Sequence, residues 1–206
     1  MVSTASRNGA TSAVSGIAIS IPKIDVRRLV ITLIGDSPLI SNKWSEKAKK
    51  QMLDKQMKVA KTAKEAKNPT EDYEATLYVH PDGGYGFPCV AFKAAAVGAC
   101  RFADGIKMTE ARGAFHVVGE LAKIEGEPSM REDMVRIAMG TADIRYRGEF
   151  KEWRTALTIA YNAAALSESQ IVSLFNISGF GIGVGEWRPQ KDGPYGRFHV
   201  ATTTEV

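Results

Sequence analysis

The sequence predicts an α+β fold, in which an antiparallel sheet carries two packed helices and a large insertion follows the first strand. Three observations support this prediction. Short segments rich in β-branched or alternating apolar residues recur along the chain and are predicted strands. Two helices with clear end signals separate these strands, and a lysine-rich segment follows the first strand. The 206 residues, 44% hydrophobic and 24% charged, are enough for one substantial domain.

The first predicted strand is residues 26–34, "VRRLVITLI", whose apolar residues predict burial on both faces. The turn residues of "GDSPLIS" end it. Residues 43–67 are rich in Lys, Ala, Gln and Met and are predicted to form a helix that stops at Asn68-Pro69. Because apolar positions are sparse in this helix, we expect an insertion that leans on the body.

The middle of the chain predicts one helix between several strands. A short strand over 74–79 and a hairpin turn in "HPDGGYG" precede Pro88, which suits the first turn of a helix running to about Phe102. Further predicted strands follow at 114–120, 121–125, 135–139, 143–150 and 154–162. In the strand over 143–150, Asp143, Arg145 and Arg147 alternate with apolar residues, which predicts one solvated face.

The second helix has the clearest start and end signals. Ser167 and Gln170 form a capping box at its start, and Gly179 is the expected C-terminal glycine. A glycine-rich turn and a last strand over 195–200 follow. This order is that of a split βαβ pattern, the ferredoxin-like or RRM-like arrangement. We expect a disordered leader over 1–20 and a single RRM-like domain over 21–206, with 41–84 as its lysine-rich insertion.

Several function classes lack their sequence signals. The glycines at 179, 181, 183 and 185 match neither a dinucleotide fingerprint nor a phosphate loop, and no nucleophile elbow or zinc-protease motif is present. The scattered His80, His116 and His199 are expected to be structural, so no catalytic residue, metal or cofactor is predicted. Two cysteines, Cys89 and Cys100, and the absence of a long apolar run indicate a cytoplasmic protein of a bacterium or an infected host cell, without membrane attachment.

The positive charge is concentrated in one place. Residues 43–67 contain nine lysines against Glu46, Asp54 and Glu65, whereas the net charge of the whole chain is +4. Such segregation favours a polyanionic partner, although a solvated helix face is the alternative.

Basic residues near aromatic rings and glycines indicate single-stranded nucleic acid, because phosphates require cations and unpaired bases require flat rings. We interpret the glycine run, including Gly181, Gly183 and Gly185, as a loop that lets a nucleic-acid backbone or a neighbouring subunit come close. Trp187 would then stack on a base unless it belongs to the core. The candidate side chains are Lys43, Lys47, Lys50, Lys58, Lys93, Arg101, Arg145, Arg147, Trp187, Arg188, Lys191 and Arg197.

Three segments together resemble the RAMP superfamily of CRISPR-associated RNA-binding proteins. "VRRLVITLIGDSPLIS" is similar to the family's opening strand, "YGFPCVAFKAAAVGACR" to its strand-to-helix junction, and "ISGFGIGVGEWRPQKDGPYGRF" to its C-terminal glycine-rich loop. At the junction, Pro88, Lys93 and Arg101 occupy comparable places, but Cys89-Val90-Ala91 replaces Gly-Ser-Ser.

The resemblance implies an RRM-like fold and a backbone-type subunit that self-assembles along RNA, or a stand-alone or viral relative that coats RNA or single-stranded DNA. Members that cleave RNA use a His, or an Asp in the first loop, where Asp36 lies here. Two alternatives therefore stay open: a metal-independent ribonuclease using one of the three histidines, and a viral structural protein that does not bind nucleic acid.

Overall fold

A four-stranded antiparallel sheet organises the chain, and the computed structural model describes it within residues 24–59, 66–137 and 140–205. The predicted leader over 1–20 lies outside these residues. Across the sheet the strands are ordered β10 (Phe198–Val200), β1 (Val26–Gly35), β9 (Arg154–Asn162) and β5 (Phe115–Val117). Along the chain, α3 (Cys89–Ala99) follows β1 and α5 (Glu168–Gly181) follows β9. This connectivity and strand order are those of a ferredoxin-like fold, so the predicted α+β class is confirmed.

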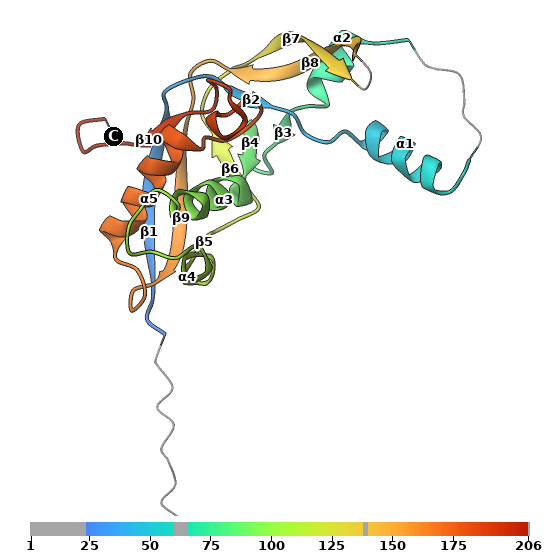
Figure 1. The fold of residues 1–206 in the computed structure, drawn as a ribbon. Helices are drawn as coiled ribbons and strands as arrows, with labels where there is room; N and C mark the ends of the chain where they lie inside the picture. Colours follow the sequence, from blue (N-terminus) through green and yellow to red (C-terminus); the bar gives the residue numbers. More distant parts are fainter. Residues whose placement is uncertain (1–23, 60–65, 138–139, 206) are drawn as a thin grey trace, which may run out of the picture.

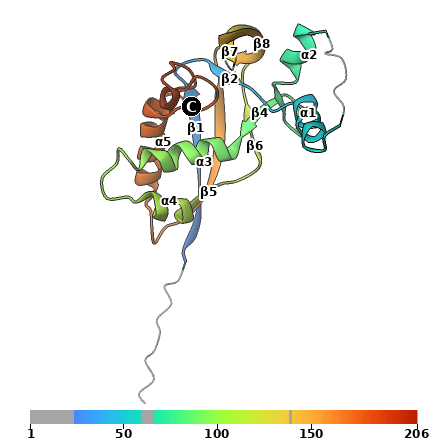
Figure 2. The same ribbon diagram turned by 45° about the vertical axis from the view of Figure 1, so that its right-hand side comes forward.

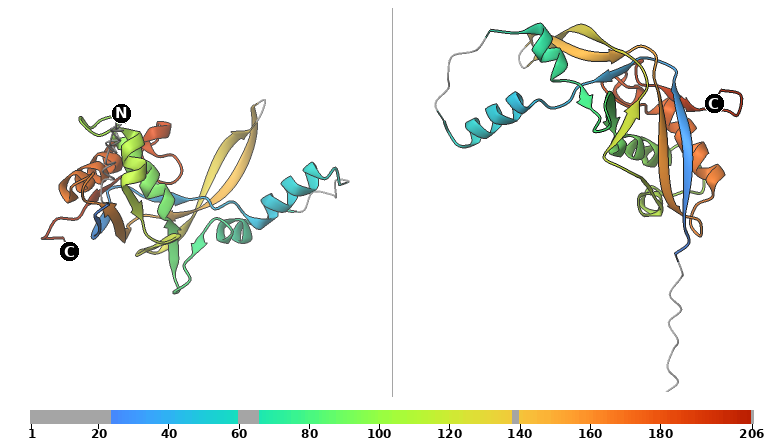
Figure 3. Two further views of the ribbon diagram at one scale, coloured as in Figure 1. Left: turned by 90° about the horizontal axis from the view of Figure 1, so that it is seen from below. Right: turned by 180° about the vertical axis from the view of Figure 1, so that it is seen from behind.

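The helices α3 and α5 cover the same face of this sheet (Figures 1 and 2). Leu33 of β1 and Ile159 of β9 are fully buried there, together with Phe92 of α3 and Phe175 of α5. No described helix or strand covers the other face, as the view from behind shows (Figure 3), and Val30 on β1 is 64% exposed. The prediction that β1 is buried on both faces is therefore wrong, because both helices lie on one side.

The ends of the helices follow local signals, with one exception. The predicted capping box forms at the start of α5, where Ser167 accepts a hydrogen bond from the Gln170 N–H, and Pro88 precedes the first turn of α3. However, α5 continues past Gly179 to Gly181. A side chain at Gly179 would collide with the backbone of Phe198, so this glycine allows α5 to pack closely on β10 rather than ending the helix.

Two smaller antiparallel sheets extend the body. One pairs β2 (Leu39–Ser41), β8 (Thr141–Phe150) and β7 (Pro128–Ile137), and the other pairs β3 (Tyr78–Val79), β4 (Tyr85–Pro88) and β6 (Leu121–Ile124). The long β7–β8 hairpin reaches away from the central sheet, with α2 (Pro69–Glu74) beside it (Figure 1).

The insertion differs from its prediction. Asn68 and Pro69 begin α2 rather than ending a helix, because Asn68 caps it and Pro69 lies in its first turn. The strand predicted over 74–79 is reduced to Tyr78–Val79, and α4 (Met108–Ala114) was not predicted.

Within the described residues, the helix predicted over 43–67 is the shorter α1 (Glu46–Gln56), of which no residue is buried. Residues 60–65 of that prediction lie outside the described residues. We call residues 46–59 the arm; it stands away from the body (Figures 1 and 3). Its root, residues 41–45, is fixed at Thr76, whose carbonyl accepts hydrogen bonds from the Ser41 hydroxyl and the Lys43 N–H.

Candidate nucleic-acid interface

The loop between α5 and β10, residues 182–197, contains the last two of the alternating glycines and is called here the glycine loop. Gly183 and Gly185 have positive φ angles of 68° and 80°. A side chain at Gly185 would meet the carbonyl of Ile40 on β2, and one at Gly183 would meet Pro189 and Gly196. The backbone that approaches these glycines is therefore the chain's own, and it fixes the loop against β2.

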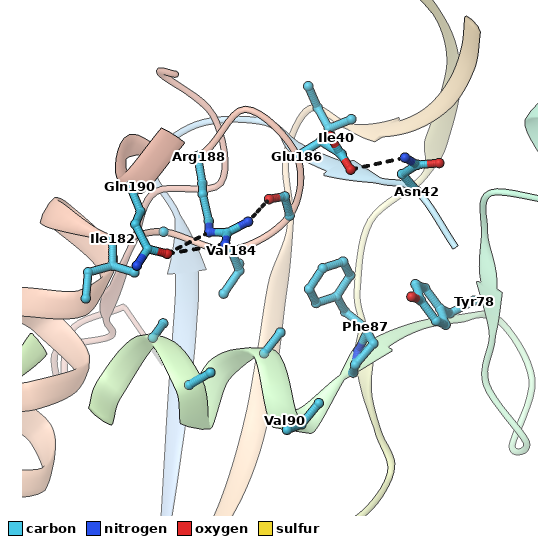
Figure 4. A pocket seen from close by; sticks show the side chains of 16 residues that line it. Ile40, Asn42, Tyr78, Phe87, Val90, Ile182, Val184, Glu186, Arg188 and Gln190 are labelled. Atoms are coloured by element: carbon cyan, nitrogen blue, oxygen red, sulfur yellow. Dashed lines mark hydrogen bonds between the residues drawn. The ribbon is translucent and has the colours of Figure 1, made fainter. Parts of the chain in front are cut away.

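A cavity of about 430 Å³, the glycine-loop cavity, lies between the glycine loop, β2 and the start of α3 (Figure 4). Its polar groups are already oriented by hydrogen bonds. The Arg188 guanidinium donates to the Gly185 carbonyl at 3.0 Å and to Gln190 Oε1, and the Asn42 amide donates to Glu186 Oε1 at 3.1 Å. The remaining lining is largely apolar and consists of Ile40, Tyr78, Phe87, Pro88, Val90, Ala91, Ala94, Ala95, Ile182 and Val184, with Gly183 and Gly185.

A second cavity of about 490 Å³, the arm-root cavity, opens where the arm leaves the body. It is lined by Lys43, Trp44, Lys49, Tyr78, Val79, Pro88, Val90, Gly119, Glu120 and Leu121. Because Tyr78, Pro88 and Val90 line both cavities, the two hollows adjoin. We call the two cavities together the groove; the glycine loop borders one end of it and the base of the arm borders the other.

The charged groups along this groove favour a negatively charged ligand. Arg188 lines the glycine-loop end, and Lys43 and Lys49 line the arm end, against the carboxylates of Glu186 and Glu120. Lys43 Nζ also lies 6.0 Å from the centre of the Tyr78 ring. Burial raises the pKa of the Tyr78 hydroxyl, so this side chain stays neutral and presents an aromatic ring to the groove.

The structure divides the residues predicted from the sequence. Lys43, Arg188, Gly183 and Gly185 line the groove. Lys47, Lys50 and Lys58 lie exposed on the arm. The others lie elsewhere on the molecule.

Trp187 is separated from the groove. It has a φ of 53° and is 47% exposed, so it is not a core residue. Its neighbours Glu186 and Arg188 line the glycine-loop cavity, but Trp187 lines neither cavity. The structure therefore does not bring Trp187 and Arg188 together at one ligand, and the stacking role of Trp187 stays a prediction.

The structure contradicts the prediction for Arg147. The sequence predicts it beside Arg145 on a solvated strand face, but it is buried and its Nη1 lies 3.0 Å from Asp133 Oδ2 on the facing strand. Arg145 remains exposed, in an ion pair of 3.4 Å with Asp143. The alternation failed because this face of the hairpin meets the glycine loop: Arg131, which pairs with Arg147 across the two strands, lies 4.7 Å from the Tyr195 ring.

The remaining predicted residues are not in the groove. Lys93 donates to the Arg112 carbonyl and lies over the Phe115 ring, which holds it beside β5. Arg197 is half-buried, and its backbone N–H donates to the Ser37 hydroxyl. The Nε atom of the Arg197 side chain is buried and has no hydrogen-bond partner in the described part of the chain. Exposed Arg101 follows α3, exposed Lys191 ends the short 3₁₀ helix Pro189–Lys191, and Gly181 ends α5.

Sequence reasoning missed Trp44, Asn42, Tyr78 and Gln190 as groove residues. Trp44 is one of the sparse apolar residues of the helix predicted over 43–67, and it is 52% exposed. The sequence did contain a signal for Trp44. This large aromatic residue stands next to the helix cap Ser45, so its ring is close in the sequence to the lysines that precede and follow it, as in sites for single strands.

The three histidines do not form an acid–base pair. His116 on β5 and His199 on β10 occupy opposite edges of the four-stranded sheet, about 14 Å apart at the usual strand spacing. His80 lies in the β3–β4 turn, where its Nδ1 accepts the Asp82 N–H. His199 Nδ1 lies 2.6 Å from Asp36, and its Nε2 lies 3.4 Å from Glu205, so carboxylates engage both nitrogens.

No protein-family model matches the chain, and no curated protein matches it. Among solved structures, the chain is similar to the crystal structure of Cmr6 from Pyrococcus furiosus, with 10% sequence identity and a TM-score of 0.46 over 87% of this chain and all of that chain. No helix among the described residues is long and apolar enough to cross a membrane.

Proposed function

We propose that the chain is a non-catalytic protein that binds single-stranded nucleic acid in the groove between the glycine loop and the arm. The observation that carries this proposal is the groove itself, in which two adjoining cavities combine apolar and aromatic walls with cations at both ends. Proteins that bind single strands combine such rings, which accept unpaired bases, with positive charge that follows the phosphates. The lysines of the arm extend this positive charge beyond the groove.

RNA is the favoured strand. Glu186 and Asn42 supply side-chain oxygens in the glycine-loop cavity, and such oxygens can accept a hydrogen bond from a ribose 2′-hydroxyl. The resemblance of the opening strand, the α3 junction and the glycine loop to RAMP proteins supports the same choice. A backbone-type subunit of a CRISPR effector, or a viral relative, is the corresponding role.

Self-assembly along the strand is part of the proposal. A single RRM-like domain contacts only a few nucleotides. The arm carries exposed Met52, Leu53 and Met57, which offer apolar surface to a neighbouring copy.

Equilibrium binding tests the proposal directly. Fluorescence anisotropy with labelled 20-nucleotide RNA, DNA of the same sequence and duplex RNA should show tightest binding to single-stranded RNA, with affinity falling as salt rises. Failure to bind any of these at low salt would refute the proposal and favour a structural protein. Specific cleavage in EDTA that His→Ala removes would instead favour a ribonuclease.

Electron microscopy tests assembly. With long RNA, the full chain should form regular filaments or rings. Isolated monomers at saturating protein would contradict self-assembly while leaving the binding proposal intact.

A further inference from the structure

The arm-root cavity contains an unusual amount of exposed apolar surface. Trp44 is 52% exposed, Val79 67% and Val90 69%, and all three line this cavity. They come from the arm root, β3 and α3, so the fold gathers them from distant parts of the chain. Exposed apolar side chains that converge on one hollow, rather than scatter, mark a binding site.

The backbone around Trp44 is fixed, which prepares the ring for a ligand. The Lys43 N–H donates to the Thr76 carbonyl at 2.9 Å on one side, and on the other Ser45 caps α1 by accepting the Ala48 N–H at 3.2 Å. Because the backbone on both sides of Trp44 is already restrained, a flat ligand that stacks on the ring has to order only the side chain of this residue.

Cations adjoin this apolar surface. Lys43 and Lys49 line the cavity, and Glu120 is the carboxylate that opposes them. Lys49 Nζ forms an ion pair of 2.6 Å with Glu46 Oε1. Both side chains are exposed, and surface ion pairs of this kind are weak enough to exchange for a phosphate. The cavity volume of about 490 Å³ lies within the range of small-molecule sites, about 300–1,000 Å³.

We infer that the arm-root cavity is a nucleotide subsite, in which an unpaired base stacks on Trp44 beside Tyr78 and the adjoining phosphate lies between Lys43 and Lys49. This inference rests on the proposed function and extends it, since it defines where the strand leaves the glycine-loop cavity. Aromatic stacking accepts every base, so the subsite has little sequence preference. The strand therefore runs from the glycine loop toward the arm.

Two exposed tryptophans give a matched test. Trp44 lines the cavity and Trp187 does not, although they are 52% and 47% exposed. Trp44→Ala should weaken binding of a labelled 20-nucleotide RNA about 5- to 150-fold, the stacking range for one base, and Trp44→Phe should retain most of the affinity. If Trp44 is the stacking residue, Trp187→Ala should change affinity less than about 2-fold, within the range of a neutral surface substitution, and a larger loss would instead support the stacking role predicted for Trp187 from the sequence.

Tryptophan fluorescence gives a second readout that does not depend on affinity. RNA should quench the emission of the Trp187→Phe variant, which keeps Trp44, more strongly than that of the Trp44→Phe variant. Thermal melting of each variant shows that the fold is intact, which we expect because neither ring is buried.

The outcomes separate the two proposals. If the natural chain binds no RNA, the proposed function fails. If it binds RNA but Trp44→Ala leaves affinity unchanged, or Trp187→Ala weakens it as much, only the subsite inference is overturned. Quenching of Trp44 by poly-glutamate but not by RNA would also overturn it, in favour of an acidic protein partner.

Discussion

The glycine loop and the arm border the same groove, but they are held in opposite ways. The loop is fixed by backbone hydrogen bonds on several sides, including those from the Glu186 N–H to the Ile40 carbonyl and from the Gly196 N–H to the Pro38 carbonyl. The arm has no buried residue and is fixed to the body at its root. One border of the groove therefore sets geometry, whereas the other supplies charge.

This difference teaches where sequence signals for binding succeed. Charge acts over distances of about 10 Å at moderate salt, so a lysine on the arm can contribute without an exact position. Stacking and forked hydrogen bonds need fixed positions, and those depend on which residues the fold brings together. Substitutions in the loop region should therefore affect stability first, and substitutions in the arm should affect binding alone.

Arg147 should give the largest effect on stability. Together with Arg131, Asp133 and Glu149 it forms a charged network that reaches the glycine loop through Tyr195, whose ring centre lies 4.7 Å from the Arg131 guanidinium. Arg147→Ala should cost about 3–5 kcal/mol, the usual result of breaking a buried ion pair. At about 2–4 °C per kcal/mol for a chain of this size, calorimetry should show a fall in Tm of about 6–20 °C.

Arg145→Ala is the matched control, two residues away on the same strand. Because Arg145 is exposed, its replacement should change the free energy of unfolding by no more than about 0.5 kcal/mol. An Arg147→Ala variant with unchanged Tm but weakened RNA binding would restore the interpretation drawn from the sequence.

Gly185→Ala should have the next largest effect. An alanine there would have to adopt a φ of 80° and would also meet the Ile40 carbonyl. Gly83 has a φ of 86° but no atom within 4 Å of the position of a Cβ, so Gly83→Ala carries only the backbone strain, about 1–2 kcal/mol. We expect Gly185→Ala to lose about 1–3 kcal/mol more than this control, the range for overpacking.

RNA affinity distinguishes the two glycine variants as well. Gly185 lines the groove and Gly83 lies in the β3–β4 turn, so RNA binding per folded molecule should fall for the first and not for the second. Equal losses of stability in urea unfolding would mean that β2 does not fix the loop at Gly185.

The arm should respond through salt dependence rather than stability. Replacing Lys47, Lys50 and Lys58 by Ala should flatten the slope of log K against log salt by about 2, since each phosphate contact on a single strand contributes about 0.7. The same charge change at exposed Lys107, Lys123 and Lys151 is the control and should leave the slope nearly unchanged. A slope that changes equally in both triple variants would indicate that only net charge matters.

Local patterns predicted much of this fold because the signals were local. The capping box of Ser167 and Gln170, the alternation over 154–162 and Pro88 before α3 each depend on residues within a few positions of one another. The ferredoxin-like order followed from placing these elements along the chain. At Asn68-Pro69 the same local signal permits a helix to stop or to start, and the sequence alone does not decide between the two.

The groove was harder to predict because its walls come from separate segments. Trp44, Tyr78 and Val90 line one cavity because β3 pairs with β4 and α3 begins directly after β4, which no spacing in the sequence encodes. The exposure of Val30 and the burial of Arg147 likewise depend on which surface each strand presents to the body. Charge composition indicated the kind of ligand that we propose, and the tertiary structure was needed to define the cavities in which we propose that it binds.

The smallest expected effect is a pH dependence of stability at the edge of the central sheet, which involves neither cavity of the groove. Burial alone would lower the pKa of His199, but hydrogen bonds and charges from Asp36 and Glu205 outweigh it and raise that pKa above its ordinary value. A raised pKa in the folded state means that the protonated imidazole stabilises the fold. This contribution is complete below the unfolded pKa of about 6.5 and is lost as the pH rises through the raised folded value.

His199→Gln should therefore lower Tm at pH 5.5 and leave it nearly unchanged at pH 8.5. At pH 5.5 the loss in the free energy of unfolding should be less than about 1 kcal/mol, because the pair is partly exposed and screened by salt. Asp36→Asn should show the same pattern, since it removes the stronger carboxylate partner at 2.6 Å. Melting curves between pH 5 and 9 measure both variants against the natural chain. A Tm difference that is constant across this range would show that His199 contributes packing alone, and RNA affinity should be unaffected in either case because His199 lines neither cavity.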